Sequence, residues 1–365
     1  MRSKLFPLQL FCLAAVPFVF GSDGCAAPTP RAGQTQPNIV NLPLVLRDSP
    51  PPAFIASIDT MKGSRDTQTR PWSDAAIAAE VNLAATLNTT HITVDTNWDY
   101  PDYVQRWVSA VRAAGKHAWF RGHPNQWENN NGATGIMTPA DYKVKLRDFI
   151  LAHPSLFESG DIFDACPEPE QGHYWSSKYG SGWTNAYPNA ATREYNQFIR
   201  DTSDIADAAF GQLGIHGVIT TIHSMNSWIG SHPGALESAT AAKMGRVTID
   251  SYPEGGTTDP QTARDARLAE LAAVENAFHL PIVIGEMGYS DQVIVDDHTQ
   301  QRVLKAELEG IGSLPYVVAL NYWVGAGTDR SGGHTHIFTG SPGNWSLRPA
   351  AYELTAFFAF KQTGP

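Results

Sequence analysis

The sequence has very little cysteine, which excludes a disulfide-built fold. Only Cys12, Cys25 and Cys166 occur among 365 residues. The first two lie in the N-terminal leader described below, so the rest of the chain holds one thiol and no intramolecular pair. A lone cysteine can serve as a nucleophile, but a buried free thiol is the commoner case. We expect the latter for Cys166.

Positive charge and phosphate-binding glycines are also scarce. Twenty-six Lys and Arg residues face 36 Asp and Glu, the net charge is −10, and no basic cluster follows the first few residues. We therefore expect no nucleic-acid partner. The first predicted strand is followed by Asp59-Thr60-Met61-Lys62-Gly63, which lacks the glycine-rich turn of nucleotide-binding open sheets. We expect no cofactor, no metal and a monomer.

The N-terminus has the pattern of an exported protein. Arg2 and Lys4 precede an almost wholly apolar run from Leu5 to Phe20, as in secretory signal peptides. Cleavage near Ser22 is one prediction. The other is lipid attachment at Cys25, because Gly24-Cys25 resembles the end of a lipoprotein box. We predict a secreted or envelope-attached protein, which contacts a membrane only through such an anchor.

Composition divides the chain into three segments. Residues 1–25 are the predicted signal peptide. Residues 26–52 contain seven prolines among polar residues, which predicts an extended linker with no core of its own. Residues 53–361 show no further low-complexity stretch and are predicted to form a single domain.

Within that domain, short apolar runs alternate with amphipathic stretches of helical length. The predicted strands are Phe54–Ile58, His91–Val94, His117–Phe120, Ile162–Ala165, Gly217–Ile222, Val247–Ile249, Pro281–Ile284 and Val317–Leu320. The predicted helices are Asp74–Leu87, Tyr100–Ala114, Pro139–Ala152, Thr192–Phe210, Ala235–Met244, Pro260–Phe278, Thr299–Glu309 and Arg348–Phe358. Eight strands alternating with eight helices predict an α/β fold, the (β/α)8 TIM barrel, with a doubly wound open sheet as the rival.

Polar and aromatic residues gather at the predicted carboxyl ends of the strands, where such barrels place their chemistry. In chain order they include Asp59, Lys62, Asp95, Asn97, Trp98, Arg121, His123, Trp127, Glu168, Glu170, His223, Asn226, Asp250, Tyr252, Glu286, Asn321, Tyr322 and Trp323. We predict that they line a cleft. Two carboxylates stand out, because Glu168 and Glu286 each end an apolar run, after the fourth and seventh predicted strands. A carboxylate pair about 5 to 5.5 Å apart is the requirement for retaining glycoside hydrolysis.

The order and kind of these residues resemble clan A glycoside hydrolases, which include cellulases and mannanases. Pro167-Glu168-Pro169 matches the last two positions of the clan's Asn-Glu-Pro motif. The resemblance implies a β-glycosidase with Glu168 as acid/base and Glu286 as nucleophile. It further implies that Tyr252 hydrogen-bonds the nucleophile and that Trp323 forms the platform under the reacting sugar.

The resemblance also suggests which residues bind the carbohydrate. His123 and His223 would line the reacting subsite. The remaining strand-end residues predicted to contact substrate are Asp59, Asn97, Trp98, Trp127 and Asn321. The departure from the clan is Pro167, which stands where the motif has asparagine. Either Asn97, Asn321 or His123 replaces its contact with the sugar 2-hydroxyl, or the substrate is unusual at that carbon.

Several alternatives stay open. Glu170 competes with Glu168 as the proton donor, and Glu286 can be read as a buried ion-pair partner of Arg121 or Lys62. A metal-dependent barrel hydrolase would use His123, Asp95, Glu168 and His334. A non-catalytic carbohydrate-binding barrel would keep the aromatic residues and use the acids only as hydrogen-bond partners.

Overall fold

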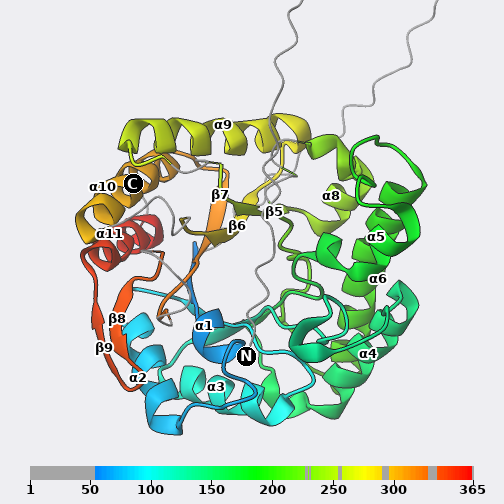
Figure 1. The fold of residues 1–365 in the computed structure, drawn as a ribbon, viewed down its shortest axis with the longest axis horizontal. Helices are drawn as coiled ribbons and strands as arrows, with labels where there is room; N and C mark the ends of the chain where they lie inside the picture. The colour runs from blue at the N-terminus through cyan, green and yellow to red at the C-terminus, as the bar shows by residue number, and fades with distance from the viewer. Residues whose placement is uncertain are drawn as a thin grey trace, which may run out of the picture. The chain divides into compact units, whose positions relative to one another are not determined.

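Seven parallel strands form the centre of the fold in the computed structural model (Figure 1). The structure describes residues 54–226, 229, 232–253, 257–289, 296–327 and 335–363. The predicted signal peptide and linker, including Cys25, lie outside the described residues, as does His334. No helix in the described part of the chain has the length and apolar character needed to cross a membrane.

The strands follow one another around the sheet in the order β4-β3-β2-β1-β7-β6-β5. Their bounds are β1 Ile55–Asp59, β2 His91–Val94, β3 His117–Phe120, β4 Ile162–Phe163, β5 Val247–Ser251, β6 Ile282–Met287 and β7 Val317–Tyr322. Each one coincides with a predicted strand to within a few residues. All pairs are parallel, as expected when helical crossovers connect successive strands.

The predicted fifth strand, Gly217–Ile222, is not a regular strand. Ile219 pairs in parallel with Ile162 of β4, and Met225 pairs with Ile249 of β5, each as an isolated bridge. Gly217 adopts a positive φ of 80°, and the Thr220 carbonyl accepts a hydrogen bond from the Ser203 hydroxyl (2.6 Å). These features interrupt the ladder. The segment still joins the two edge strands, so the ring closes where the barrel prediction requires it.

Helices surround the strands (Figure 1). The eight predicted helices correspond to α2 Asp74–Ala85, α3 Pro101–Ala113, α4 Pro139–Ala152, α6 Ala190–Leu213, α8 Ser238–Met244, α9 Pro260–Phe278, α10 Asp297–Gly312 and α11 Pro349–Thr363. Their N-termini are fixed by local side chains: Ser73 caps α2, and Thr138 and Asn189 form capping boxes at α4 and α6. The sequence prediction of these helices is confirmed.

The structure adds short elements that the sequence did not predict. Helix α1 (Met61–Ser64) follows β1, helix α5 (His173–Tyr179) follows β4, and β8 (Phe338–Ser341) pairs with β9 (Asn344–Leu347) as an antiparallel hairpin. Helices α1 and α5 follow the carboxyl ends of β1 and β4. They therefore belong to the loops at the end of the barrel where the strands' carboxyl ends lie.

The core has two parts because the strands are buried on both faces. Trp119, Ile162, Ile222, Val283 and Ala319 form a small cluster of their own. Their neighbours along the strands, such as Ala118 and Phe120 beside Trp119, belong to the large cluster that also contains the helices. Alternate strand residues thus fill the barrel interior and the layer between sheet and helices.

Candidate active site at the carboxyl ends of the strands

Glu286 lies at the end of β6 and is held by two donors. The strand is buried throughout, and Glu286 is only 7% exposed. Its Oε2 accepts a hydrogen bond from the Tyr252 hydroxyl (2.8 Å), and its Oε1 forms an ion pair with Arg121. Hydrogen bonds directed at the charged form of a carboxyl group favour that form. The arrangement therefore suits a nucleophilic carboxylate.

Gly285 explains the Ile-Gly-Glu sequence before this acid. A Cβ at position 285 would lie 2.5 Å from Ser224 Oγ and 2.6 Å from Asp250 Oδ1. Both atoms belong to the neighbouring side of the barrel, so any larger residue would push Asp250 and Glu286 apart. The glycine is a packing requirement of the site.

Arg121, at the end of β3, is the centre of this charge network. It is 1% exposed and contacts Asp59 (3.2 Å) and Asp250 (3.3 Å) in addition to Glu286. Burial raises the pKa of Asp59 to about 7, against the lowering effect of Arg121. Burial, together with the charge of Glu286, raises the pKa of Asp250 well above its usual range. One guanidinium cannot neutralise three buried carboxylates, which favours the protonated forms of the two aspartates.

Glu168 follows β4 in an unusual backbone conformation. Its φ of 43° and ψ of 55° are left-handed, which costs a non-glycine residue about 1–3 kcal/mol. Its N–H donates to the Ser224 carbonyl (2.7 Å), and its Oε1 accepts from the Asn226 amide (2.9 Å). Burial, and then the charges of Glu286, Glu128 and Glu170, raise the pKa of Glu168 to about 8, despite Arg121.

Asn226 stands among the predicted strand-end residues, but the sequence gives it no particular role. Its side chain donates to Glu168, and its own N–H donates to Glu170 Oε1. Glu170 also accepts a hydrogen bond from Tyr195 (3.3 Å). The competing acid thus supports the residue that orients Glu168.

His123 and His223 are both buried. His123 forms an ion pair with Glu128 (3.0 Å), and its Nδ1 lies 3.0 Å from the Pro124 carbonyl. Burial opposes a charged His123, but Glu128 raises the pKa of the imidazole, and His123 in turn lowers that of Glu128 to about 2 against the effect of burial. Burial lowers the pKa of His223 to about 4, so that ring is neutral. Glu128, which looks like an ordinary surface acid in the sequence, is the charged partner of this pair.

Tyr252 and Trp323 lie against each other beside Glu286. Their rings meet edge to face at 6.5 Å, both are partly exposed, and the Lys62 ammonium lies 5.3 Å from the Trp323 ring centre. The Trp323–Val324 peptide bond is cis. A partly exposed indole beside the Glu286–Tyr252 pair is a ring on which a sugar can stack.

Two predicted substrate-binding tryptophans belong to the core instead. Trp98 stacks on Phe149 at 5.3 Å and 13°, and Trp127 stacks on Phe198 at 5.1 Å and 21°. They are 5% and 1% exposed. Both indole rings pack against neighbouring aromatic side chains, and neither leaves a face exposed on which a sugar could stack.

Three further predicted binding residues point into the protein. Asp59 pairs with Arg121, and the Asn321 amide donates to Asp59 (3.1 Å) and to the Gly285 carbonyl (2.9 Å). The Asn97 amide donates to Asn125 (2.6 Å). All three are buried. Their side chains bond to the protein itself and so support the residues at the carboxyl ends of the strands.

Cys166 is a buried free thiol, as expected. Burial raises its pKa well above the usual range, although a hydrogen bond with Tyr142 opposes this. A thiol that stays protonated is a poor nucleophile. The residue contributes packing beneath Glu168.

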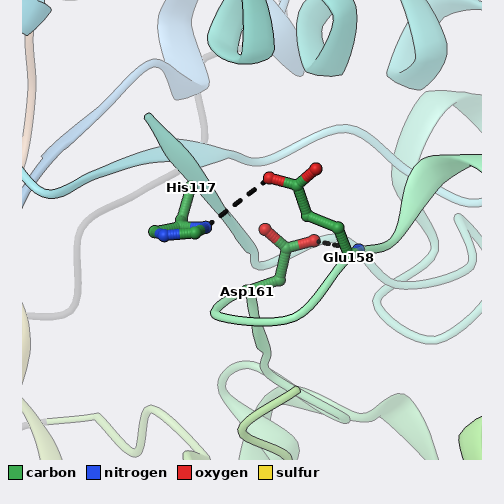
Figure 2. Close-up of side chains that lie close together, drawn as sticks. All are labelled: His117, Glu158 and Asp161. Atoms are coloured by element: carbon green, nitrogen blue, oxygen red, sulfur yellow. Dashed lines mark hydrogen bonds and ion pairs between the residues drawn. The ribbon is translucent and has the colours of Figure 1, made fainter. Parts of the chain in front are cut away.

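The possible metal ligands of the described residues gather at the opposite end of the barrel. Three ligand atoms come within 4.8 Å of one another only at His117, Glu158 and Asp161 in this part of the chain (Figure 2). These residues lie at the amino-terminal ends of β3 and β4, away from Glu286. Arg112 already pairs with both Glu158 (3.2 Å) and Asp161, so the cluster is an ion-pair network. His123, Asp95 and Glu168 form no comparable group within the described ranges.

No family model matches the chain, and no curated protein matches it. Solved structures do share its fold. A GH5_18 structure from Bifidobacterium longum subsp. infantis has a TM-score of 0.62 at 13% identity, with 84% of this chain and 79% of that chain covered. A GH5_18 structure from Streptomyces cattleya in complex with GlcNAc has a TM-score of 0.61 at 14% identity, covering 86% and 81%.

An endo-β-1,4-glucanase from Xanthomonas axonopodis pv. citri is also similar, with a TM-score of 0.53 at 11% identity and coverage of 84% and 98%. At such identities the likeness concerns the fold. The predicted TIM barrel is confirmed, and these structures that share it are of glycoside hydrolases. The chain has the (β/α)8-barrel fold of glycoside hydrolase structures.

Proposed function

We propose that the protein is a retaining glycoside hydrolase that cleaves β-glycosidic bonds in an oligosaccharide or polysaccharide. One observation carries the proposal. Glu168, whose pKa burial and the charge of Glu286 raise to about 8, follows β4, and Glu286, ion-paired with Arg121, lies at the end of β6. A carboxyl group favoured in its protonated form facing one held by a cation is the pattern of an acid and nucleophile pair.

In the first step, Glu286 attacks the anomeric carbon while Glu168 transfers its proton to the leaving oxygen. The glycosidic bond breaks and a glycosyl ester forms on Glu286. Tyr252 and Arg121 hold the attacking carboxylate in place. The Asn226 amide donates to Glu168 Oε1, so the transferable proton is carried on Oε2.

In the second step, Glu168 acts as a base. Once Glu286 is esterified its negative charge is gone, and with it one of the causes that raise the pKa of Glu168. Glu168 then accepts a proton from water, which attacks the anomeric carbon and releases Glu286. Two inversions at one carbon give net retention.

The ligands and substrates in the names of the similar structures support the proposed substrate class. One of the Bifidobacterium longum GH5_18 structures holds Manβ1-4GlcNAc, and another similar structure is a GH113 β-1,4-mannanase. Together with the glucanase, they favour β-1,4-linked neutral sugars as first substrates. The non-catalytic alternative is less well supported, because a binding barrel has no need of a carboxyl group with a pKa of about 8.

The test is hydrolysis by the purified protein of a panel of β-mannans, β-glucans and their oligosaccharides, followed by proton NMR. We expect the β-anomer as the first product, before mutarotation. An initial α-anomer would exclude the double-displacement mechanism. Undiminished hydrolysis by Glu286→Ala would exclude Glu286 as the nucleophile.

Export is part of the proposal. The apolar leader and the proline-rich segment of residues 26–52 support secretion or attachment to the envelope. Mass spectrometry of the mature N-terminus distinguishes a cut near Ser22 from a lipid-modified Cys25. A mature protein that keeps the leader would contradict export.

A further inference from the structure

A small polar pocket opens between the loops that follow β1 and β3. Its volume is about 240 Å³, and its lining residues are Arg65, Asp66, Gln68, Asn130 and Asn131. Pockets for drug-sized ligands span roughly 300–1,000 Å³, so this one suits a single ring. Every lining residue is polar, which disfavours an apolar ligand.

The pocket adjoins the candidate catalytic acids. The Asn130 amide donates to Glu128 Oε2 (3.0 Å), and Glu128 is one of the charges that raise the pKa of Glu168. Glu128 pairs with His123 (3.0 Å) just after β3, and the Arg65 guanidinium pairs with Asp95 (3.7 Å) just after β2. A ligand in the pocket would therefore lie on the same face of the barrel as the substrate unit bound at Glu168.

Gln68 has an unused hydrogen-bond donor in this wall. The residue is 3% exposed, and its Oε1 accepts from the Asn97 N–H (3.2 Å). Its Nε2 has no hydrogen-bond partner within the described ranges. Leaving a buried amide donor unpaired costs about 1–3 kcal/mol. A ligand hydroxyl that reached Nε2 would remove that cost.

The charges of the pocket are already compensated. Arg65 pairs with Asp95, and Asp66 pairs with Lys62 (3.1 Å). The groups left to recognise a ligand are the amides of Gln68, Asn130 and Asn131, which both donate and accept hydrogen bonds, as sugar hydroxyls do. A charged sugar acid would find no unpaired partner among the lining residues.

We propose that this pocket is a subsite for one neutral pyranose unit of the substrate, adjacent to the unit held at Glu168 and Glu286. The inference rests on the proposed function and adds a requirement to it. Substrates must extend beyond the cleaved linkage to reach the pocket. Short glycosides that stop at the catalytic acids forgo the contact with Gln68.

Binding is measured by calorimetry on the full chain carrying Glu168→Gln, with manno- and cello-oligosaccharides of two to six units. We expect the affinity to rise about tenfold at one particular chain length, at which the added sugar unit enters the pocket. Gln68→Met keeps the side-chain volume and removes the amide, and Asn131→Asp suits the left-handed backbone at 131 (φ 51°) and removes a donor. Each variant is expected to reduce this tenfold gain in affinity to about twofold or less. Gln105→Met on α3 makes the same change outside the pocket and is expected to keep the gain.

The result separates the subsite from the proposed function. A gain in affinity that survives Gln68→Met and Asn131→Asp, or no oligosaccharide binding at all, overturns the subsite. Tighter binding of a glucuronate-containing oligosaccharide than of its neutral counterpart of equal length overturns the assignment to neutral sugars. A different measurement tests the catalytic proposal: hydrolysis that persists in Glu286→Ala would overturn it.

Discussion

The two ends of the barrel each hold an arginine among acids, and the two networks differ in burial and in charge balance. At the carboxyl ends, Arg121 is 1% exposed and serves Glu286, Asp59 and Asp250. At the amino-terminal ends, the Arg112 side chain is 22% exposed and serves Glu158 and Asp161. Burial and an excess of acid raise the pKa of Asp59 and of Asp250 in the Arg121 network.

The two networks also differ in the hydrogen-bond donors that their acids accept from. Asp161 accepts hydrogen bonds from the N–H groups of Ala118 (2.9 Å) and Glu158 (2.8 Å), so it fixes a turn between strands (Figure 2). Glu286 instead accepts from the side chains of Tyr252 and Arg121. One network holds the backbone and the other holds a reactive group. Similar residue types therefore serve stability at one end and, in our proposal, chemistry at the other.

The largest effect is expected for Glu286→Ala. Loss of the nucleophile should lower kcat/KM by at least about 10⁴-fold, with little change in the free energy of unfolding beyond relief of charge repulsion. Glu158→Ala at the other end is the matched control and should keep full activity. Comparable losses in the two variants would show that the ends do not differ in role.

Glu168→Ala should have the next largest effect, and one that depends on the leaving group. We expect a loss of about 10²–10⁴-fold on natural linkages and a much smaller loss on 2,4-dinitrophenyl glycosides, which need no protonation. Because Glu168 must be protonated to act, wild-type activity should fall as the pH rises through about 8. That alkaline decline should disappear in the variant, and equal losses on both substrates would contradict the role of proton donor.

The third effect concerns stability and compares the two arginines directly. Arg121→Met removes the only cation that contacts Glu286, Asp59 and Asp250 in the described network and should lower the free energy of unfolding by about 3–5 kcal/mol. Arg112→Met should cost less, about 1–2 kcal/mol, because Glu158 is half exposed and the buried Asp161 keeps its two backbone N–H donors. Urea denaturation measures both. A larger loss for Arg112→Met would reverse the comparison.

The smallest effect on activity is expected for Asp161→Ala. It leaves two backbone N–H groups near Arg112 without their acceptor and should cost about 3 kcal/mol of unfolding free energy. At temperatures where the variant stays folded, kcat should be unchanged. Asp148→Ala, at an exposed site beside Arg147, is the control and should change neither. A selective loss of kcat in Asp161→Ala would indicate coupling between the ends.

Much of the fold could be predicted from local sequence patterns. Apolar runs such as Ile282–Ile284 and the cap at Ser73 are local signals, so strands and helices were placed to within a few residues. The fifth strand was the exception. Its irregularity depends on Gly217 and on a side-chain contact from Ser203, and neither is visible as a break in an apolar run.

The candidate site was predictable in its acids and less so in their supports. Glu168 and Glu286 stand out because each ends a strand, whereas the sequence offers Arg121 only as a possible ion-pair partner. Trp98 and Trp127 lie in the core, and a strand-end tryptophan has the same sequence signature whether it faces the cleft or the core. Asn226 received no role, since its contact with Glu168 spans 58 residues of sequence.

The sequence by itself determined the alternation of strands and helices and the two carboxylates at strand ends, because both depend on neighbouring residues along the chain. The tertiary structure decided which acids hold protons, which aromatic residues face the cleft and which arginine is buried. Those properties depend on desolvation and on charges brought together from distant strands. The pKa of Glu168 is the clearest case, since the charges that shift it come from distant parts of the barrel.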